Sequence, residues 1–403
     1  MRSTTRRVLS TLLVLLAACA VGEAGGGVTV RDSAGIEIVE SNGPQWTGGS
    51  EWRVSEAPML SIGSGLDGEP ATQFTSIGGL ARFDDGRLTV LDVRSSELRF
   101  FDSTGTHLQT VGRKGSGPGE FSSVLLTLHR LPGDSLLVSG AMPARQSLFT
   151  KGGDFVREIR PVPVAGSPFP LTASAHFADG TAILTATRVI EERTGIWVDS
   201  TPFFVAPPGA DSAVAFRRLP YQRFSGNGGS IASVAFGPIG RFAIVGSRFY
   251  HGFPERYEVA EYAPDGRLVR LIRRAWTPVA VPAEIRDAHR DTLLARATTP
   301  VLRARLEVTQ FAETFPAFDR LRPDLAGNLW VRSARTDEAV LAGSGHGRGS
   351  AIWSVFDSTG AWLGDVRLPE GLDVNEIGTD YIAGVSYDEN DVPLVRVYRL
   401  IKP

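Results

Sequence analysis

A glycine turn recurs along this chain at regular intervals. Each copy lies between short runs of apolar, β-forming residues, and the glycines are Gly86, Gly133, Gly180, Gly240 and Gly327. The first two intervals are 47 residues each, and the next two are 60 and 87 residues. A second series of turns follows, with Phe-Asp-Ser-Thr-Gly at 101–105 and again at 356–360. Glycine with Asp or Ser between β-rich flanks is typical of hairpins, so each unit is predicted to contain two.

Two hairpins in about 45 residues make four short strands, which is the pattern of one blade of a β-propeller. A degenerate sixth turn at Gly378 brings the predicted number of blades to six. The last unit supplies only three strands, so the segments at 52–54 and 59–63 are expected to provide its outer strand and cover the edge. The predicted fold is therefore all-β: a six-bladed β-propeller over residues 28–403 with N-to-C strand closure.

The interval of 87 residues leaves room for an insertion, predicted at 282–318 as a helical hairpin. Pro282–Ala297 and Pro300–Phe315 are expected to be helices, because proline suits the first helical position and Thr299 suits an N-cap. The second segment carries a helical apolar stripe, made of Val301, Ala304, Val308, Phe311 and Phe315. This stripe either packs on the propeller or belongs to a lid or partner-docking element.

The first 18 residues are predicted to be a signal peptide. Three arginines precede an apolar run at 8–18, which is too short to span a bilayer as a helix. The run ends in Leu16-Ala17-Ala18-Cys19, which resembles the bacterial lipobox. The resemblance implies that Cys19 is the lipid attachment site, and Ala20 after it implies the outer membrane of the cell envelope. Residues 19–27 are then expected to form a lipidated flexible tether. An ordinary secretory signal with a coincidental cysteine remains the alternative, and Sec and twin-arginine export both stay open.

The best unit spans residues 79–121. It carries Asp-Gly-Arg-Leu-Thr-Val-Leu-Asp, then Phe-Phe-Asp-Ser-Thr-Gly, then the glycine-rich segment 112–121. This unit resembles an NHL repeat, and the whole chain resembles bacterial six-bladed β-propeller lipoproteins of the NHL-repeat/TolB-like kind. The third and fourth units depart from the pattern because they lack the aspartate of Val-Leu-Asp.

The composition and motifs favour no particular chemistry. With 42 basic and 44 acidic residues, the chain does not look like a general nucleic-acid binder. No nucleophile elbow is present, and the six histidines have no metal-ligand spacing. The glycine-rich segments at 115–120 and 343–350 fit turns, although the second could be a mobile binding loop. We therefore predict no cofactor and no metal, and leave catalysis uncertain but disfavoured.

One set of residues is a candidate binding site. Counting back from the hairpin turns places Arg82, Arg130 and His176 at one position of the innermost strand, and Arg322 fits with a slip of one residue. These cationic or titratable groups could bind a small anion at the central channel, more strongly on mild acidification. The alternative is that they brace neighbouring blades by pairing with acidic side chains.

Two functions are compatible with these features. The first is an envelope-anchored ligand- or protein-binding or scaffolding module, whose partners are the membrane, through the lipid, and an unknown protein or small anionic ligand. The second is a six-bladed hydrolase or lyase that resembles lactonases, which implies a channel metal held by carboxylates and asparagines. Only five asparagines occur, which disfavours the second function. Carboxylates converging in the channel would favour catalysis, whereas apolar or arginine-lined walls would favour binding.

Overall fold

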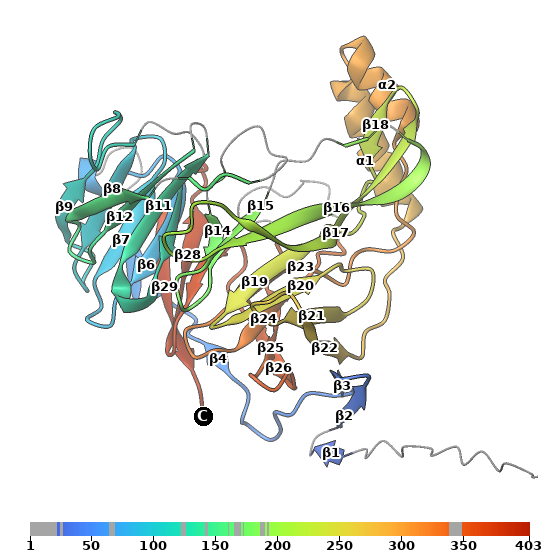
Figure 1. Ribbon diagram of the computed structural model, residues 1–403, viewed down its shortest axis with the longest axis horizontal. Coiled ribbons are helices and arrows are strands. Elements are labelled where there is room, and N and C mark those ends of the chain that lie inside the picture. Colours follow the sequence, from blue (N-terminus) through green and yellow to red (C-terminus); the bar gives the residue numbers. More distant parts are fainter. Residues whose placement is uncertain are drawn as a thin grey trace, which may run out of the picture.

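The computed structural model describes residues 22–24, 27–63, 69–121, 126–141, 144–159, 161–164, 171, 173–185, 190–191, 193–337 and 349–403. The predicted signal peptide, Cys19 and most of the glycine-rich segment 343–350 lie outside these residues. The described residues are mostly β with two α-helices, and their strands form six sheets (Figure 1). Among them, no helix is both long and apolar enough to span a membrane.

Three of the sheets are four-stranded and antiparallel. Sheet 1 contains β6 (Ile77–Arg82), β7 (Leu88–Asp92), β8 (Glu97–Phe101) and β9 (His107–Val111). Sheet 2 contains β10 (Thr127–Arg130), β11 (Leu136–Ala141), β12 (Ala144–Phe149) and β13 (Phe155–Ile159). Sheet 5 contains β23 (Phe318–Pro323), β24 (Leu329–Ser333), β25 (Ile352–Phe356) and β26 (Trp362–Arg367). Short 3-10 turns lie at Pro70–Thr72 and Pro132–Asp134.

Sheet 3 has a long central hairpin. Its strands are β14 (Ala173–His176), β15 (Ala182–Thr185), β16 (Thr194–Ala206), β17 (Val214–Asn227) and β18 (Ile231–Ser233). Strands β16 and β17 have 13 and 14 residues, so they extend beyond the sheet as an arm (Figure 1). This arm makes the third unit longer than the first two.

Sheet 4 joins two distant parts of the chain. It contains β19 (Arg241–Val245), β20 (Arg248–Gly252), β21 (Glu258–Tyr262) and β22 (Leu268–Arg274), and it continues through β3 (Ile36–Ser41), β2 (Val28–Ser33) and β1 (Gly22–Ala24). Strand β3 runs parallel to β22. The sequence did not predict this addition, and the prediction of a flexible tether at 19–27 is wrong for the residues of β1, which pair with β2.

Sheet 6 also contains strands from two parts of the chain. Its strands are β27 (Asp373–Ile377), β28 (Tyr381–Tyr387), β29 (Pro393–Ile401), β4 (Arg53–Val54) and β5 (Leu60–Ile62). Both β4 and β5 are antiparallel to β29. Leu60 and Ile62 lie opposite Val397 and Val395, so apolar side chains face one another across this pairing.

The first strands of the six sheets, β6, β10, β14, β19, β23 and β27, contact one another in succession. We call these strands the inner ring. Apolar clusters fill the spaces between neighbouring sheets: sheets 1 and 2, 3 and 4, 4 and 5, 5 and 6, and 6 and 1. The core is thus divided into layers, and each of these five clusters packs two sheets against one another.

The repeated Phe-Asp-Ser-Thr-Gly sequence forms the same turn twice. In both copies the aspartate, Asp102 or Asp357, accepts hydrogen bonds from the backbone N–H groups two and four residues later. The glycines Gly105 and Gly360 have φ of 90° and 85°, which side chains with a Cβ rarely adopt. The turn therefore requires both residue types, which explains the repeated sequence.

One turn of the glycine series was misplaced. Gly240 was predicted to lie in a hairpin before a second strand, but the next residues, Arg241–Val245, are the first strand of sheet 4. The hairpin between β19 and β20 instead turns at Gly246. Gly240 is required for a different reason: a Cβ there would lie 2.5 Å from the carbonyl oxygen of Pro220.

The insertion contains two helices, α1 (Ala283–Arg296) and α2 (Pro300–Val308). The Thr299 side chain caps α2 by accepting a hydrogen bond from the N–H of Leu302, as predicted. The second helix is shorter than predicted, because it ends at Val308 and leaves Phe311 and Phe315 in extended chain. The predicted stripe is therefore not one helical face, and Val301 is 70% exposed.

Candidate functional site

The three residues predicted to share one position do share it. Arg82, Arg130 and His176 are the last residues of β6, β10 and β14. Each is followed by the same turn, in which the next residue's N–H donates to the carbonyl oxygen four residues later. The equivalence of these positions in sheets 1, 2 and 3 is therefore confirmed.

The contacts of Arg130 are those of a brace between sheets. Its Nε and Nη2 donate to Asp134, and its Nη1 donates to the carbonyl oxygen of Arg82 at 2.8 Å. Glu376 lies 3.7 Å from the same Nη1 and accepts a hydrogen bond from the backbone N–H of Arg82. The Arg82 guanidinium lies 4.7 Å from the ring centre of Tyr381. Anion binding by this set stays a prediction, and these contacts favour the bracing alternative instead.

His176 is not poised to gain charge near neutral pH. Burial, and to a smaller extent the nearby His129, lower the pKa of His176 to about 4. Burial also lowers the pKa of His129 to about 4, and the two rings are 6.3 Å apart. A pKa of about 4 argues against the expected gain of anion binding on mild acidification, because His176 would stay neutral in that range; the gain itself stays a prediction.

The carboxylates of the inner ring are engaged by protein groups. Asp319 accepts both hydrogen bonds of a paired Arg332 guanidinium, and Asp373 accepts one from Arg320 at 2.7 Å. Glu376 accepts hydrogen bonds from Tyr381 and from the Arg82 backbone. Over the described residues, no group of three or more His, Cys, Asp or Glu side chains is arranged to hold a metal. The sequence led us to expect converging carboxylates in a catalytic channel and arginine-lined walls in a binding channel. The inner ring carries several arginines, and its carboxylates named above are paired, so it fits ligand binding better than metal-dependent catalysis.

A separate groove lies where the arm meets the helical insertion. We call α1, α2 and the outer parts of β16–β18 the lobe, which projects from the sheets in Figure 1. Hydrogen bonds hold the lobe together: the Ser225 side-chain hydroxyl on β17 donates to the carbonyl oxygen of Val308, and the backbone of Ala235 pairs with residues 310 and 312. Phe315 packs with Val281 and Ile285 beneath the helices.

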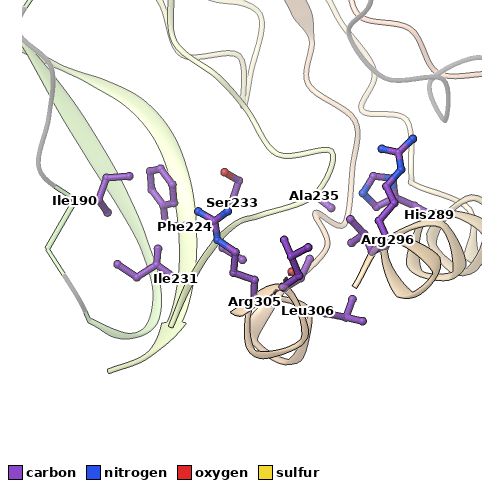
Figure 2. Close-up of a pocket in the computed structure, with 13 residues that line it drawn as sticks. Ile190, Phe224, Ile231, Ser233, Ala235, His289, Arg296, Arg305 and Leu306 are labelled. Atoms are coloured by element: carbon purple, nitrogen blue, oxygen red, sulfur yellow. Dashed lines mark hydrogen bonds between the residues drawn. The ribbon is translucent and has the colours of Figure 1, made fainter. Parts of the chain in front are cut away.

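The groove of the lobe has a volume of about 630 Å³, which lies in the usual range for small-molecule sites. Figure 2 shows its two walls, one formed by the strands and one by the helices. The lining residues are Ile190, Phe224, Ile231, Ala232, Ser233 and Ala235 on the strand side, and His289, Leu293, Arg296, Leu302, Arg305, Leu306 and Thr309 on the helical side. Most of these side chains are apolar, so the groove offers an apolar surface to a ligand.

The charged groups of the groove are all basic. Arg296 and Arg305 are exposed, and within the described part of the chain neither forms an ion pair. Burial, with a smaller contribution from the charge of Arg296, lowers the pKa of His289. His289 is therefore neutral near pH 7 and packs on the rings of Phe236 and Phe311. The groove thus combines apolar walls with two guanidinium groups that are free to pair with an anion.

The groove was not predicted from the sequence, although the helices carry a signal of it. His289, Leu293 and Arg296 are spaced i, i+4, i+7 on α1, and Leu302, Leu306 and Thr309 have the same spacing at α2. Residues with this spacing lie on one face of a helix, and the same spacing on two neighbouring helices indicates that both faces line one surface. The predicted stripe beginning at Val301 lay on a different face of α2, and nothing local indicated that the arm would supply the opposite wall.

Comparisons with known proteins give information about the fold of this chain and not about its function. No family model matches the chain, and no curated protein matches it. Its structure is similar to that of a member of the DUF4221 family from Bacteroides vulgatus, with a TM-score of 0.50 and 12% identity, covering 88% of this chain and 100% of that chain.

Two further structures resemble it less closely. One is from Bacteroides fragilis and is provisionally named an exported protein, with a TM-score of 0.47 and 12% identity over 91% of this chain and 99% of that chain. The other is a gluconolactonase from Xanthomonas campestris, with a TM-score of 0.39 and 14% identity over 82% of this chain and 87% of that chain. The chain is thus structurally similar to six-bladed propeller proteins, and a shared fold at such identities transfers no activity.

Proposed function

We propose that this protein is a lipid-anchored binding module of the cell envelope, built on a closed six-bladed β-propeller. Six sheets, the succession of contacts in the inner ring and the pairing of β4 and β5 with β29 support the closed fold. The lipobox-like sequence ending in Cys19 supports the anchor. The groove of the lobe is the binding site.

The position of the anchor leaves the groove free. Only Ala20 and Val21 separate Cys19 from β1, so an acyl group on Cys19 would hold β1 within about 10 Å of the bilayer surface. Strand β1 lies at the end of the molecule opposite α1 and α2 (Figure 1). The groove would then face away from the anchoring membrane and accept ligand from the surrounding compartment.

The groove's chemistry specifies its ligand as a small molecule with an apolar body and one acidic group. The single observation that carries this proposal is the pairing of apolar walls with the unpaired Arg296 and Arg305. An apolar body gains about 25 cal/mol for each Å² of apolar surface that it buries. A charge-assisted hydrogen bond to an arginine adds roughly 1.5–3 kcal/mol, which corresponds to a tenfold preference or more.

Calorimetric titration with dodecanoate and with dodecanol tests this assignment, because the two probes share one apolar chain and differ in charge. We expect dodecanoate to bind at least tenfold more tightly. Arg305→Gln should reduce this preference, and Leu306→Asp should weaken both probes. Arg286→Gln removes a charge from α1 outside the groove lining and serves as the control. Equal affinity of the two probes, or unchanged binding by Leu306→Asp, would overturn the assignment.

The anchor is tested separately by Cys19→Ser. We expect the variant to lose fatty acylation and to leave the membrane fraction, because two or three acyl chains are needed for stable anchoring. Metabolic labelling with a fatty acid and membrane fractionation measure both effects. Acylation of a mature Cys19→Ser protein would contradict the lipid attachment at this residue.

A further inference from the structure

The strand wall of the groove presents one hydroxyl on the same face as an aromatic ring. Phe224 on β17 lies opposite Ser233 on β18, and Gly226 lies opposite Ile231. Side chains of directly opposed residues lie on one face of a sheet, as do those two residues apart on a strand. Gln222 is two residues before Phe224, so it lies on this face as well. The Ser233 hydroxyl is thus placed at the groove next to the amide of Gln222.

The Ser233 hydroxyl is an oriented hydrogen-bond donor. Nε2 of Gln222 donates to Oγ of Ser233 at 2.9 Å. A serine hydroxyl has one O–H donor besides its acceptor lone pairs, and the amide occupies the acceptor side. Ser233 lines the groove and is exposed, and among the described residues no acceptor takes its hydrogen. A ligand atom that accepts a hydrogen bond is therefore favoured here over one that donates.

Arg305 brings a positive charge to the same part of the groove. Figure 2 shows its side chain extending from α2 toward the strand wall that carries Ser233. Arg296 instead lies on the α1 side with His289, where burial and, to a smaller extent, the charge of Arg296 lower the pKa of that histidine. The two arginines thus belong to different parts of the groove, and Arg305 belongs to the part with the hydroxyl.

We propose that Ser233 determines which acidic ligand the groove accepts, and this rests on the function proposed above. Its hydroxyl donates to the acid group whose charge Arg305 balances. The ligand class is thereby narrowed to oxygen acids, since one acid group can accept from a guanidinium and a hydroxyl together. Gln222 and the acidic Asp199 opposite it do not line the groove. Gln222 is therefore a positioning residue, which acts on the ligand through Ser233.

Calorimetric titration of Ser233 variants with dodecanoate and dodecanol tests this role. Ser233→Ala should weaken dodecanoate at least about fivefold, because a hydrogen bond to a charged group is lost, and should weaken dodecanol less. Ser233→Thr keeps a hydroxyl and should keep the preference for dodecanoate. The control is Ser230→Ala, which makes the same change three residues earlier, outside the groove lining, and should leave both affinities unchanged.

Gln222→Leu tests the positioning of the hydroxyl. Alone, it should weaken dodecanoate more than dodecanol, because Ser233 loses the amide that orients it. In the Ser233→Ala background it should have no further effect, because Gln222 acts only through that hydroxyl. Equal weakening in both backgrounds would show that Gln222 has a structural role, and would overturn the oriented donor.

The place of the acid group is tested by comparing the two arginines. Arg305→Gln should reduce the preference for dodecanoate more than Arg296→Gln does, because Arg305 extends toward Ser233 (Figure 2). An equal or larger effect of Arg296→Gln would place the acid group away from Ser233, and would overturn its role.

Failure of this role can be told apart from failure of the proposed function. If the wild type binds dodecanoate and dodecanol equally, the groove does not select acids, and the role of Ser233 falls with the proposed function. If the wild type prefers dodecanoate and Ser233→Ala keeps the full preference, the groove selects acids without Ser233, and only the role of Ser233 is overturned.

Discussion

His251 shows how a single buried side chain links the stability of this fold to pH. It is 6% exposed on β20, and its Nε2 lies 2.9 Å from the carbonyl oxygen of Pro220. Burial lowers the pKa of His251 to about 4, although this hydrogen bond acts in the opposite direction. A histidine in the unfolded chain has a pKa near 6.5, so the unfolded state binds more protons between about pH 6.5 and 4. Stability is therefore complete above this window and falls as the pH falls through it.

The variant His251→Gln should remove this dependence while an amide N–H still reaches Pro220. Between pH 7 and pH 5, we expect the wild type to lose about 2 kcal/mol more unfolding free energy than the variant. Urea denaturation at a series of pH values measures both curves. Other titrating groups act equally on the two proteins, so parallel curves would show that His251 does not carry the effect.

The partners of site residues are harder to predict than their positions. Arg82 and Arg130 were placed correctly because each precedes a turn whose residues are local in sequence. Their acidic neighbour Glu376 is 294 residues from Arg82, and Asp134 reaches Arg130 from a backbone with φ of 62°. No periodicity in the sequence indicates either contact, so the choice between anion binding and bracing required the structure.

At the scale of elements, local sequence signals predicted the hairpin turns well. They predicted poorly how far helix α2 and the arm extend. The turns at Asp102 and Asp357 are encoded by one aspartate and one glycine each, and both formed as expected. Helix α2 ends early because Thr309 leaves helical geometry, with ψ of 117°, and the chain then pairs beside Ala235. Tertiary pairing here overrides a helical apolar pattern, as it commonly does. The groove was missed for the same reason, since one of its walls is an arm distant in sequence.

At the scale of the whole molecule, one apolar cluster packs sheet 1, the first in the chain, against sheet 6, the last. It contains Leu80, Leu88 and Phe101 from sheet 1 and Val395 and Val397 from sheet 6, and Ile62 of β5 lies among them at 3% exposure. The strand that pairs with β29 therefore also packs on the first sheet. Because side chains from sheets 1 and 6 share this cluster, a defect at this point should weaken both sheets.

Ile62→Asp tests whether the ring is one cooperative unit. A carboxylate at this buried position has no partner in the cluster, so we expect a loss of about 3–5 kcal/mol in unfolding free energy. Met59→Asp places the same charge three residues earlier at a side chain that is 44% exposed, and should change stability by less than about 0.5 kcal/mol. Hydrogen exchange should show lost protection in β6–β8 as well as in β28–β29, since both groups of strands contact Ile62 through one cluster. Loss confined to β28 and β29 would mean that sheet 6 unfolds alone, and that its pairing with β5 does not stabilise the rest of the ring.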